Sequence, residues 1–352
     1  MHEHHTHRGN MLKNSIKHKR DRFFLSRVLL SPLKLINTVL VIISYKLRLI
    51  KSLGLPVVLD IEPTNACNFR CPHCQVTSAD WVKNNMSVEQ FNKIINTFPH
   101  ALRVKLQGMG EPFLNKSLIE FIDKTCSKNY WCEVTSNGSL FDKRPIKDLA
   151  KYKNFQLTIS IDAPNKELFE KIRPGSDFNK VIDNVKDLQT STNMDLSAWM
   201  VVDQDNESSV ADTIKLVKSI NISIFGLQII VIDYAKETLR AETIEKRINM
   251  ENRSALYSDW QEQAKNNDVE LDIADTLYDK SHPCPWPWQG TYIDVVGNVI
   301  PCCRIGDARV SCMGNINKTP FKDIWNSKEY KDFRTMHKNN KIPKICSSCY
   351  KN

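Results

Sequence analysis

Three cysteines lie within a stretch of eight residues in this chain, at Cys67, Cys71 and Cys74. So dense a group favours metal binding, and the gap from Cys67 to Cys71 does not fit the paired C-x2-C knuckles of structural zinc sites. A cubane of four irons and four sulfides normally takes four thiolates, so a local triad leaves one iron without a protein ligand. That open iron predicts a catalytic metal centre, because a structural site has every position filled. Zinc and inert buried thiols are the alternatives.

A second group of cysteines, with the spacing C-x17-C-x43-C-x2-C, occupies the C-terminal part of the chain: Cys284, Cys302, Cys346 and Cys349. An alternating pattern broken by Gly297-Asn298 predicts a β-hairpin that delivers Cys302, and a helix from about residue 320 returns the chain to the last two cysteines. Four thiolates can close an iron–sulfur cluster or hold zinc. The other cysteines have less specific roles: Cys303 and Cys312 are alternative ligands or hydrogen donors, and Cys126 and Cys132 are expected to be packing thiols.

The composition is that of a globular protein with a large core, since the chain has 352 residues of which 41% are hydrophobic. No signal peptide with a clear apolar stretch and cleavage site opens the chain. The eleven cysteines are therefore expected to remain reduced, in the cytoplasm, and available for metal.

The formal charge of +9 is concentrated near the N-terminus, where ten Lys and Arg residues lie between positions 13 and 51. They surround an apolar series that is too short to span a bilayer. Such a segment is predicted to lie in the headgroup region of an anionic membrane, as a peripheral contact on its inner face, and packing against the protein's own core is the alternative. A nucleic-acid partner is not expected. The His-rich start of the chain is expected to be unstructured.

From residue 57 onward, short apolar runs alternate with helical patterns, which is typical of parallel βα units. Six strands are predicted, at residues 57–62, 102–107, 131–135, 155–161, 196–202 and 224–230. Ser87 followed by Gln90 forms a capping box at the start of one helix, and further helices are predicted in 116–127, 178–190 and 208–219. Six units fall short of the eight that close a barrel, so the predicted fold class is α/β, a partial (β/α)6 barrel with a small C-terminal domain of hairpin and helix.

The expected domain organisation has four parts: a basic amphipathic segment (1–56), the partial barrel (57–235), a helical connector (236–283) and a cysteine-bearing C-terminal domain (284–352). Reactive groups in such sheets gather at the carboxyl ends of the strands. The triad follows the first strand, and the next three strands are followed or ended by Gly108, Gly110, Glu111, Ser136, Asn137, Ser160 and Asp162. Each motif alone is weak, because Gly-x-Gly is usually a turn and a strand-end Asp is often a helix cap. Their coincidence predicts one site.

These motifs together resemble the radical S-adenosylmethionine (SAM) superfamily, and the resemblance covers residues 57–349. It implies that the open iron is chelated by the amino and carboxylate groups of SAM, and that an electron from the cluster cleaves SAM to a 5′-deoxyadenosyl radical. It also implies SAM contacts from His73, Gly108, Gly110, Glu111, Ser136, Asn137, Ser160 and Asp162. The chain departs from the family pattern at Met109, which interrupts a pair of glycines, and at His73, where an aromatic ring is usual. Arg173 and Asn206 lie where relatives place site-forming polar groups, and a turn or cap role is equally open for both.

The C-terminal cysteines resemble those of the SPASM domain and its shorter "twitch" form. That resemblance implies a second, auxiliary 4Fe-4S cluster held by Cys284, Cys302, Cys346 and Cys349. Because the chain ends three residues after Cys349, a single auxiliary cluster is expected.

The implied activity is hydrogen abstraction from an unactivated carbon, with electrons supplied by a donor such as flavodoxin or ferredoxin. A fully ligated auxiliary cluster can accept the electron left on the substrate, so the expected reaction is a two-electron oxidation, catalysed by an oxidoreductase. The expected substrate is a sugar, a cyclitol or a lipid-linked glycan, since no compact leader-binding domain is recognised before the barrel. The alternatives are a peptide- or protein-modifying maturase or epimerase and, in another class, a non-catalytic iron–sulfur or zinc-binding protein. No catalytic side chain is singled out by the sequence.

Overall fold

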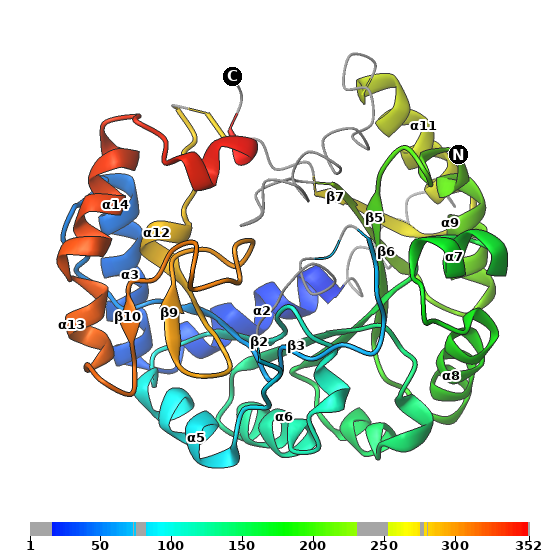
Figure 1. Cartoon of the computed structure of the whole chain (residues 1–352), viewed down its shortest axis with the longest axis horizontal. Coiled ribbons are helices and arrows are strands. Elements are labelled where there is room, and N and C mark those ends of the chain that lie inside the picture. Colours follow the sequence, from blue (N-terminus) through cyan, green and yellow to red (C-terminus); the bar gives the residue numbers. More distant parts are fainter. Residues whose placement is uncertain are drawn as a thin grey trace, which may run out of the picture.

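The computed structural model describes residues 16–72, 74, 82–230, 253–274, 278–279 and 281–350. Ten strands of this part of the chain form one sheet in the order β10-β9-β8-β1-β2-β3-β4-β5-β6-β7. In this order every adjacent pair from β8-β1 to β6-β7 is parallel. At the other edge of the sheet β9 pairs antiparallel with both β8 and β10. Figure 1 shows the sheet curled into an open barrel with helices on its outer face.

The six predicted strands are confirmed to within one residue at each end: β1 (Val58–Ile61), β2 (Arg103–Leu106), β3 (Trp131–Ser136), β4 (Phe155–Ser160), β5 (Leu196–Val202) and β6 (Ile224–Ile229). The segment expected to be a helical connector contains both α11 (Arg253–Asn266) and a seventh parallel strand, β7 (Glu270–Ala274). In this strand Leu271 and Ile273 pack against the core, and the acidic Glu270 and Asp272 alternate with them. That alternation was the available signal for a strand.

The helices of the barrel are amphipathic and pack their apolar faces on the outside of the sheet: α5 (Val88–Thr97), α6 (Leu118–Ser127), α7 (Lys166–Ile172), α8 (Phe178–Ser191) and α9 (Val210–Ser219). The predicted cap of α5 is confirmed, because the Ser87 side chain accepts a hydrogen bond from the Gln90 amide at 3.1 Å. Short 3-10 turns complete the loops: η1 (Pro112–Leu114), η2 (Phe141–Lys143), η3 (Ile146–Lys151), η4 (Glu207–Ser209) and η5 (Lys344–Cys349).

The inner face of the sheet is polar. Leu59, Ile61, Val104 and Leu106 belong to the core between sheet and helices, so the alternate residues of β1 and β2 face the interior of the barrel. There Glu133 of β3 forms ion pairs with Arg103 and, at 4.0 Å, with Lys105 of β2. Asp60 of β1 is fully buried and its pKa is raised by burial. A polar interior of this kind suits a barrel that admits a hydrophilic substrate.

The C-terminal region contributes the predicted hairpin, β8 (Gly290–Ile293) and β9 (Asn298–Ile300), with Gly297 at φ +89° in its turn. The structure adds a feature that was not predicted, the parallel pairing of β8 with β1, which makes the hairpin part of the barrel sheet. The remaining elements are β10 (Gly314–Asn315), α12 (Trp286–Gln289), α13 (Phe321–Trp325) and α14 (Lys328–Lys338). The fold is thus the predicted partial barrel with a C-terminal auxiliary domain.

The N-terminal segment forms two helices, α2 (Ile16–Leu29) and α3 (Pro32–Lys46), which pack at the amino ends of the strands. The ring of Phe23 lies 5.7 Å from that of Trp131, the first residue of β3, and Val41 packs with Val57 and Leu102 just before β1 and β2. Among the described residues, no single helix is long and apolar enough to cross a membrane, and α2 and α3 together meet that test only as a pair bent by 111°.

Candidate active site

The triad loop, residues 65–74, begins at the carboxyl end of β1. The Glu111 amide donates to the Ala66 carbonyl at 2.8 Å, and the Arg70 amide donates to the Pro174 carbonyl at 2.8 Å. A third bond, from the Cys74 amide to the Cys71 carbonyl at 3.0 Å, closes a tight turn between two of the cysteines. The loops after β2 and α7 therefore fix the loop that carries the three thiols.

The three thiols suit a cationic centre. Burial raises the pKa of Cys67 to about 11 and that of Cys71 to about 12, with the nearby Arg173 acting against the rise at Cys71. The raised pKa keeps the thiols of Cys67 and Cys71 protonated at neutral pH, whereas a bound iron ion would deprotonate a coordinating thiol. Among the described residues, no three His, Cys, Asp or Glu side chains converge closely enough to hold a single metal ion. Thiolates are the ligands that iron–sulfur clusters take, so the donor type of the loop agrees with the predicted cluster, whose assignment to these three thiols stays a prediction.

The glycines after β2 are required by packing within the protein. A Cβ at Gly110 would overlap the carbonyl oxygens of Thr64, just before the triad loop, and of Ala66 within it, and one at Gly108 would lie 2.7 Å from the Tyr292 hydroxyl. The sequence assigned both glycines to a close approach of SAM, and the structure gives a different physical reason for each. They let the β2 loop lie directly against the triad loop and the C-terminal hairpin.

Glu111 is a buried anchor between three strand ends. Its carboxylate accepts hydrogen bonds from the Ser136 hydroxyl at 2.8 Å, the Asn137 amide at 2.8 Å and the Phe113 amide at 3.1 Å. The Asn137 side chain in turn donates to the Asn68 side chain at 3.0 Å, inside the triad loop. Burial raises the pKa of Glu111, opposed by these hydrogen bonds. The predicted residues after β2 and β3 thus form one network with the triad loop.

Asp162, beyond the end of β4, is fully buried and paired with Arg173. Both the Nε and an Nη atom of Arg173 lie 2.6 Å from one carboxylate oxygen, and the Val201 amide donates to the other at 2.9 Å. Both carboxylate oxygens therefore have partners within the protein, and the predicted contact of Asp162 with SAM stays a prediction. Asn206 acts as a cap, donating to the carbonyls of Asp162 and Val201.

Two further predicted SAM contacts are Ser160 and His73. Ser160 is half-buried at the end of β4, and its hydroxyl has no hydrogen bond within the part of the chain that the structure describes. His73 lies outside the described residues.

Three cysteines of the second set, Cys284, Cys346 and Cys349, lie near Tyr350. The Cys284 amide donates to the Tyr350 hydroxyl at 2.9 Å, and the Cys349 carbonyl accepts from the Tyr278 amide at 2.7 Å. Burial raises the pKa of Cys284 to about 12. A hydrogen bond between the thiols of Cys302 and Cys303 raises the pKa of the first, which burial raises further, and lowers that of the second.

Three further cysteines belong to neither group. Cys312 is exposed and donates to the Gly314 carbonyl at 3.3 Å. Cys126 and Cys132 are buried in the core, as predicted.

Two residues that were not predicted take part in these sites. His337 of α14 lies with its Nε2 3.8 Å from the Cys346 sulfur and its Nδ1 3.1 Å from the Tyr350 hydroxyl, and burial lowers its pKa to about 4. Glu62, the residue after β1, accepts from the Tyr292 hydroxyl at 2.9 Å and the Met109 amide at 3.0 Å, and burial raises its pKa to about 7. The acidic residues at alternate positions, Asp60 in β1 and Glu62 just after it, were the available signal for Glu62.

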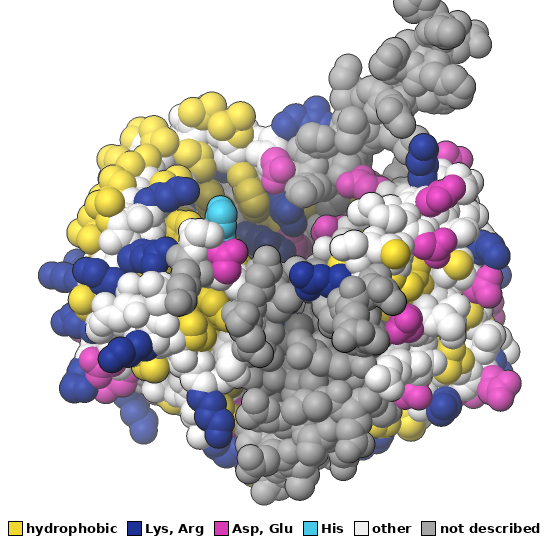
Figure 2. Space-filling view, turned by 90° about the horizontal axis from the view of Figure 1, so that it is seen from above, with side chains coloured by type: hydrophobic (Ala, Val, Ile, Leu, Met, Phe, Trp, Pro, Cys, Tyr) yellow, Lys and Arg dark blue, Asp and Glu magenta, His cyan; other side chains and the backbone are white. Residues whose placement is uncertain are grey.

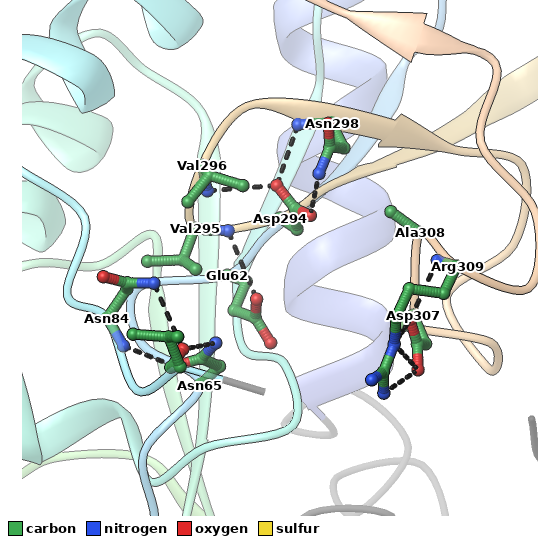
Figure 3. A pocket seen from close by; sticks show the side chains of 12 residues that line it. Glu62, Asn65, Asn84, Asp294, Val295, Val296, Asn298, Asp307, Ala308 and Arg309 are labelled. Carbon is green, nitrogen blue, oxygen red and sulfur yellow. Dashed lines mark hydrogen bonds and ion pairs between the residues drawn. The ribbon is translucent and has the colours of Figure 1, made fainter. Parts of the chain in front are cut away.

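A cavity of about 200 Å³ lies beside Glu62, between the carboxyl end of β1 and the C-terminal hairpin. Figure 3 shows Glu62 pointing toward a space bounded by the hairpin turn and by the loop with Asp307 and Arg309. Polar and apolar side chains share its lining, and the polar ones are Glu62, Asn65, Asn84, Asp294, Asn298, Asp307 and Arg309. The cavity thus adjoins both cysteine-bearing parts of the chain.

Comparison with protein families finds two matches. The model of the radical SAM superfamily matches residues 61–217, and that of the iron–sulfur cluster-binding SPASM domain matches residues 284–350. The predicted resemblance is confirmed by both.

Individual relatives share the arrangement at low identity. The antilisterial bacteriocin subtilosin biosynthesis protein AlbA of Bacillus subtilis is 24% identical over 280 residues, which is 78% of this chain and 60% of AlbA. The AdoMet-dependent heme synthase of Methanosarcina barkeri is 20% identical over 316 residues, 84% of this chain and 88% of the synthase. This chain therefore spans about 60% of the length of AlbA but most of the length of the synthase.

The fold is shared with solved structures. SuiB of Streptococcus suis bound to S-adenosylmethionine superimposes with a TM-score of 0.67 at 16% identity, over 80% of this chain and 68% of SuiB. A second structure shows SuiB bound to the precursor peptide SuiA, with a TM-score of 0.66 at 16% identity, over 79% and 66% of the two chains.

Proposed function

Because the chain belongs to the radical SAM superfamily and carries a C-terminal SPASM domain, we propose that it is a radical SAM enzyme that modifies a precursor peptide or a protein. The proposed substrate class is based on two similar proteins: AlbA, a bacteriocin biosynthesis protein, and SuiB, which has a similar fold and was solved with a precursor peptide bound. The expected oxidation of a sugar, cyclitol or lipid-linked glycan has no support among these comparisons, and the alternative of a peptide maturase is better supported.

The family implies two kinds of cofactor, a 4Fe-4S cluster with SAM and an auxiliary iron–sulfur centre. We assign the first cluster to Cys67, Cys71 and Cys74, and the auxiliary cluster to Cys284, Cys302, Cys346 and Cys349. When bound, the first cluster and SAM supply a 5′-deoxyadenosyl radical that removes a hydrogen atom from the substrate.

The chain's own residues hold this machinery in place. Glu111 and Asn137 fix the triad loop, and Arg173, held by Asp162, keeps a positive charge beside Cys71. The unpartnered hydroxyl of Ser160 is the best placed of the predicted contacts to donate to SAM. We assign the cavity beside Glu62 to the path of the substrate, since its mixed lining offers valine side chains for apolar contact and amide and carboxylate side chains for hydrogen bonds to a peptide.

The auxiliary centre suits removal of an electron from the substrate, if four thiolates close it. An external donor of the flavodoxin or ferredoxin type would reduce the first cluster.

The experiment is anaerobic reconstitution with iron and sulfide, reduction, and assay of 5′-deoxyadenosine with SAM. The variant with Cys67, Cys71 and Cys74 all replaced by Ala should form none while keeping the iron of the auxiliary centre. Cys126→Ala, at a core thiol assigned to packing, is the matched control and should still form 5′-deoxyadenosine. Undiminished 5′-deoxyadenosine from the triple variant would sink the assignment.

The substrate class is tested with peptide and small-molecule fractions of the source cells. Peptide fractions should stimulate 5′-deoxyadenosine formation and contain a peptide whose mass falls by two hydrogens, or which gains solvent deuterium if it is epimerised. Stimulation by the small-molecule fraction alone would instead favour a reaction on a small metabolite, the second candidate, which the full-length match to the heme synthase supports.

A further inference from the structure

One surface of the protein carries an unusual concentration of exposed apolar side chains. Eleven of the fourteen large hydrophobic residues exposed in the described part of the chain fall between residues 25 and 53. They form what we call the N-terminal apolar surface: Leu25, Leu29, Leu30, Leu33, Leu35, Ile36, Val39, Ile42, Ile43, Leu47 and Leu53. Figure 2 shows hydrophobic side chains gathered on one side of the molecule, with Lys and Arg at their border. A contiguous patch of this size is uncommon on a protein without a partner.

The helices that carry this surface are firmly attached to the barrel by their other side. Lys19 of α2 forms an ion pair with Asp195 at 2.8 Å, and Arg20 lies 3.6 Å from Glu133 of β3. The Asn37 side chain of α3 exchanges two hydrogen bonds with the Leu55 backbone, at 2.9 and 3.0 Å, and Tyr45 donates to the Pro283 carbonyl at 2.9 Å. The exposed leucines and isoleucines are therefore the side left uncovered after packing.

The charge of the chain is segregated in the same segment. Residues 16–51 contain nine Lys and Arg and a single acidic residue, Asp21, whereas residues 52–352 contain 38 residues of each sign. Almost the whole net charge of +9 therefore belongs to the two helices and the turn that follows them. An apolar surface within so basic a segment calls for a partner that is both apolar and anionic.

A second copy of this chain does not fit, because a symmetric contact would bring two such basic segments together in a low-dielectric interface. An anionic bilayer supplies both requirements, with acyl chains for the leucines and acidic headgroups for the cations around them. We infer that the N-terminal apolar surface docks on an anionic lipid bilayer, with α2 and α3 lying flat at its interface. This inference does not depend on the proposed substrate.

The placement of the surface fixes the orientation of the docked enzyme. The helices contact residues at the beginnings of the strands, such as Leu102 and Trp131, whereas the triad loop and Glu111 follow the ends of strands. The cysteine triad therefore faces away from the bilayer, and the substrate reaches the enzyme from the aqueous side.

The test is flotation of the full-length, reconstituted protein with vesicles of phosphatidylcholine alone or mixed with phosphatidylglycerol. Wild type should float with the anionic vesicles at low salt, and high salt should release a large part of it, because screening weakens each charge contact. The variant Leu29→Ser, Leu33→Ser, Ile36→Ser should lose binding by roughly tenfold or more, because three exposed aliphatic side chains no longer enter the interface. The matched control places Ser at the three exposed hydrophobics elsewhere, Val82, Val296 and Met336, and should bind like wild type.

A charge-reversed variant, Lys46→Glu, Arg48→Glu, Lys51→Glu, should lose the preference for anionic vesicles. Failure of wild type to float with anionic vesicles at low salt would overturn the inference, as would equal flotation of wild type and the Leu29, Leu33, Ile36 variant. Wild type that sediments as a dimer, and becomes monomeric with those three Ser substitutions, would show that the surface is an interface between copies instead.

Discussion

The ion pair between Asp162 and Arg173 gives the sharpest prediction for stability. In Asp162→Asn the amide oxygen can still accept from the Val201 amide, which now bonds at 2.9 Å. The amide nitrogen must then point at Arg173, where two guanidinium nitrogens lie 2.6 Å from the present oxygen. The change therefore leaves a buried guanidinium without its counter-charge and places a donor against donors.

The magnitude follows from burial. Asp162 is fully buried and the Arg173 side chain is only 10% exposed, and removing one partner of such a pair costs about 3–5 kcal/mol. The matched control is Asp187→Asn, which breaks the ion pair of Asp187 and Lys147, whose side chains are 63% and 52% exposed. An exposed pair of this kind is worth about 0–1 kcal/mol.

The assay is thermal unfolding of the reconstituted proteins under anaerobic conditions. At roughly 2 °C per kcal/mol for a large domain, Asp162→Asn should lower the Tm by roughly 6–10 °C and Asp187→Asn by no more than about 2 °C. Equal shifts in the two variants would refute the structural role of the pair. A normal Tm combined with weakened SAM binding would return Asp162 to the direct SAM contact that its position in the sequence suggested.

Two further predictions concern the loops around the triad. Gly110→Ala should displace the triad loop at a cost of about 1–3 kcal/mol and lower the amount of iron bound there, because the new methyl group meets two carbonyl oxygens. The neighbouring variant Met109→Ala is the control and should bind as much iron as wild type. Full iron content in the Gly110→Ala variant would contradict this packing. The pKa of Glu62, raised to about 7, predicts that this residue makes the protein less stable as the pH rises from about 4.5 through 7, by up to about 3 kcal/mol. The pH dependence of the unfolding free energy should therefore be flatter in Glu62→Gln than in wild type over that window, and identical slopes would show that the carboxyl titrates normally.

The parts of this structure that the sequence predicted are those set by local pattern. Short apolar runs between helical patterns located β1 to β6, because a strand buried in a parallel sheet is largely apolar whatever its neighbours are. The Ser87 cap was visible because it acts over three residues. The spacing of the cysteines likewise indicates metal binding, because the ligand type and the gaps between ligands are both visible in the sequence. None of these inferences needed knowledge of a distant segment.

The features that escaped prediction depend on contacts between distant segments. The bond from Tyr292 to Glu62 joins residues 230 positions apart, and no local period reports it. The packing of Gly110 against the Thr64 and Ala66 carbonyls was not predicted, because the sequence does not show which backbone lies in front of that glycine. The pairing of Asp162 with Arg173, eleven residues away, was not predicted either.

The pairing of β8 with β1, from Val58 opposite Gly290 to Ile61 opposite Ile293, has a consequence for protein engineering. A chain shortened before residue 284 would expose the backbone amides and carbonyls along one side of β1, and an unpaired edge strand is prone to aggregation. Expressing the barrel alone should thus yield insoluble material even though its own helices and strands are complete. Grafting a C-terminal module from a relative onto this barrel would succeed only if the donor supplies a strand in the same register, so modules in such chimaeras should be exchanged together with the strand that β1 accepts.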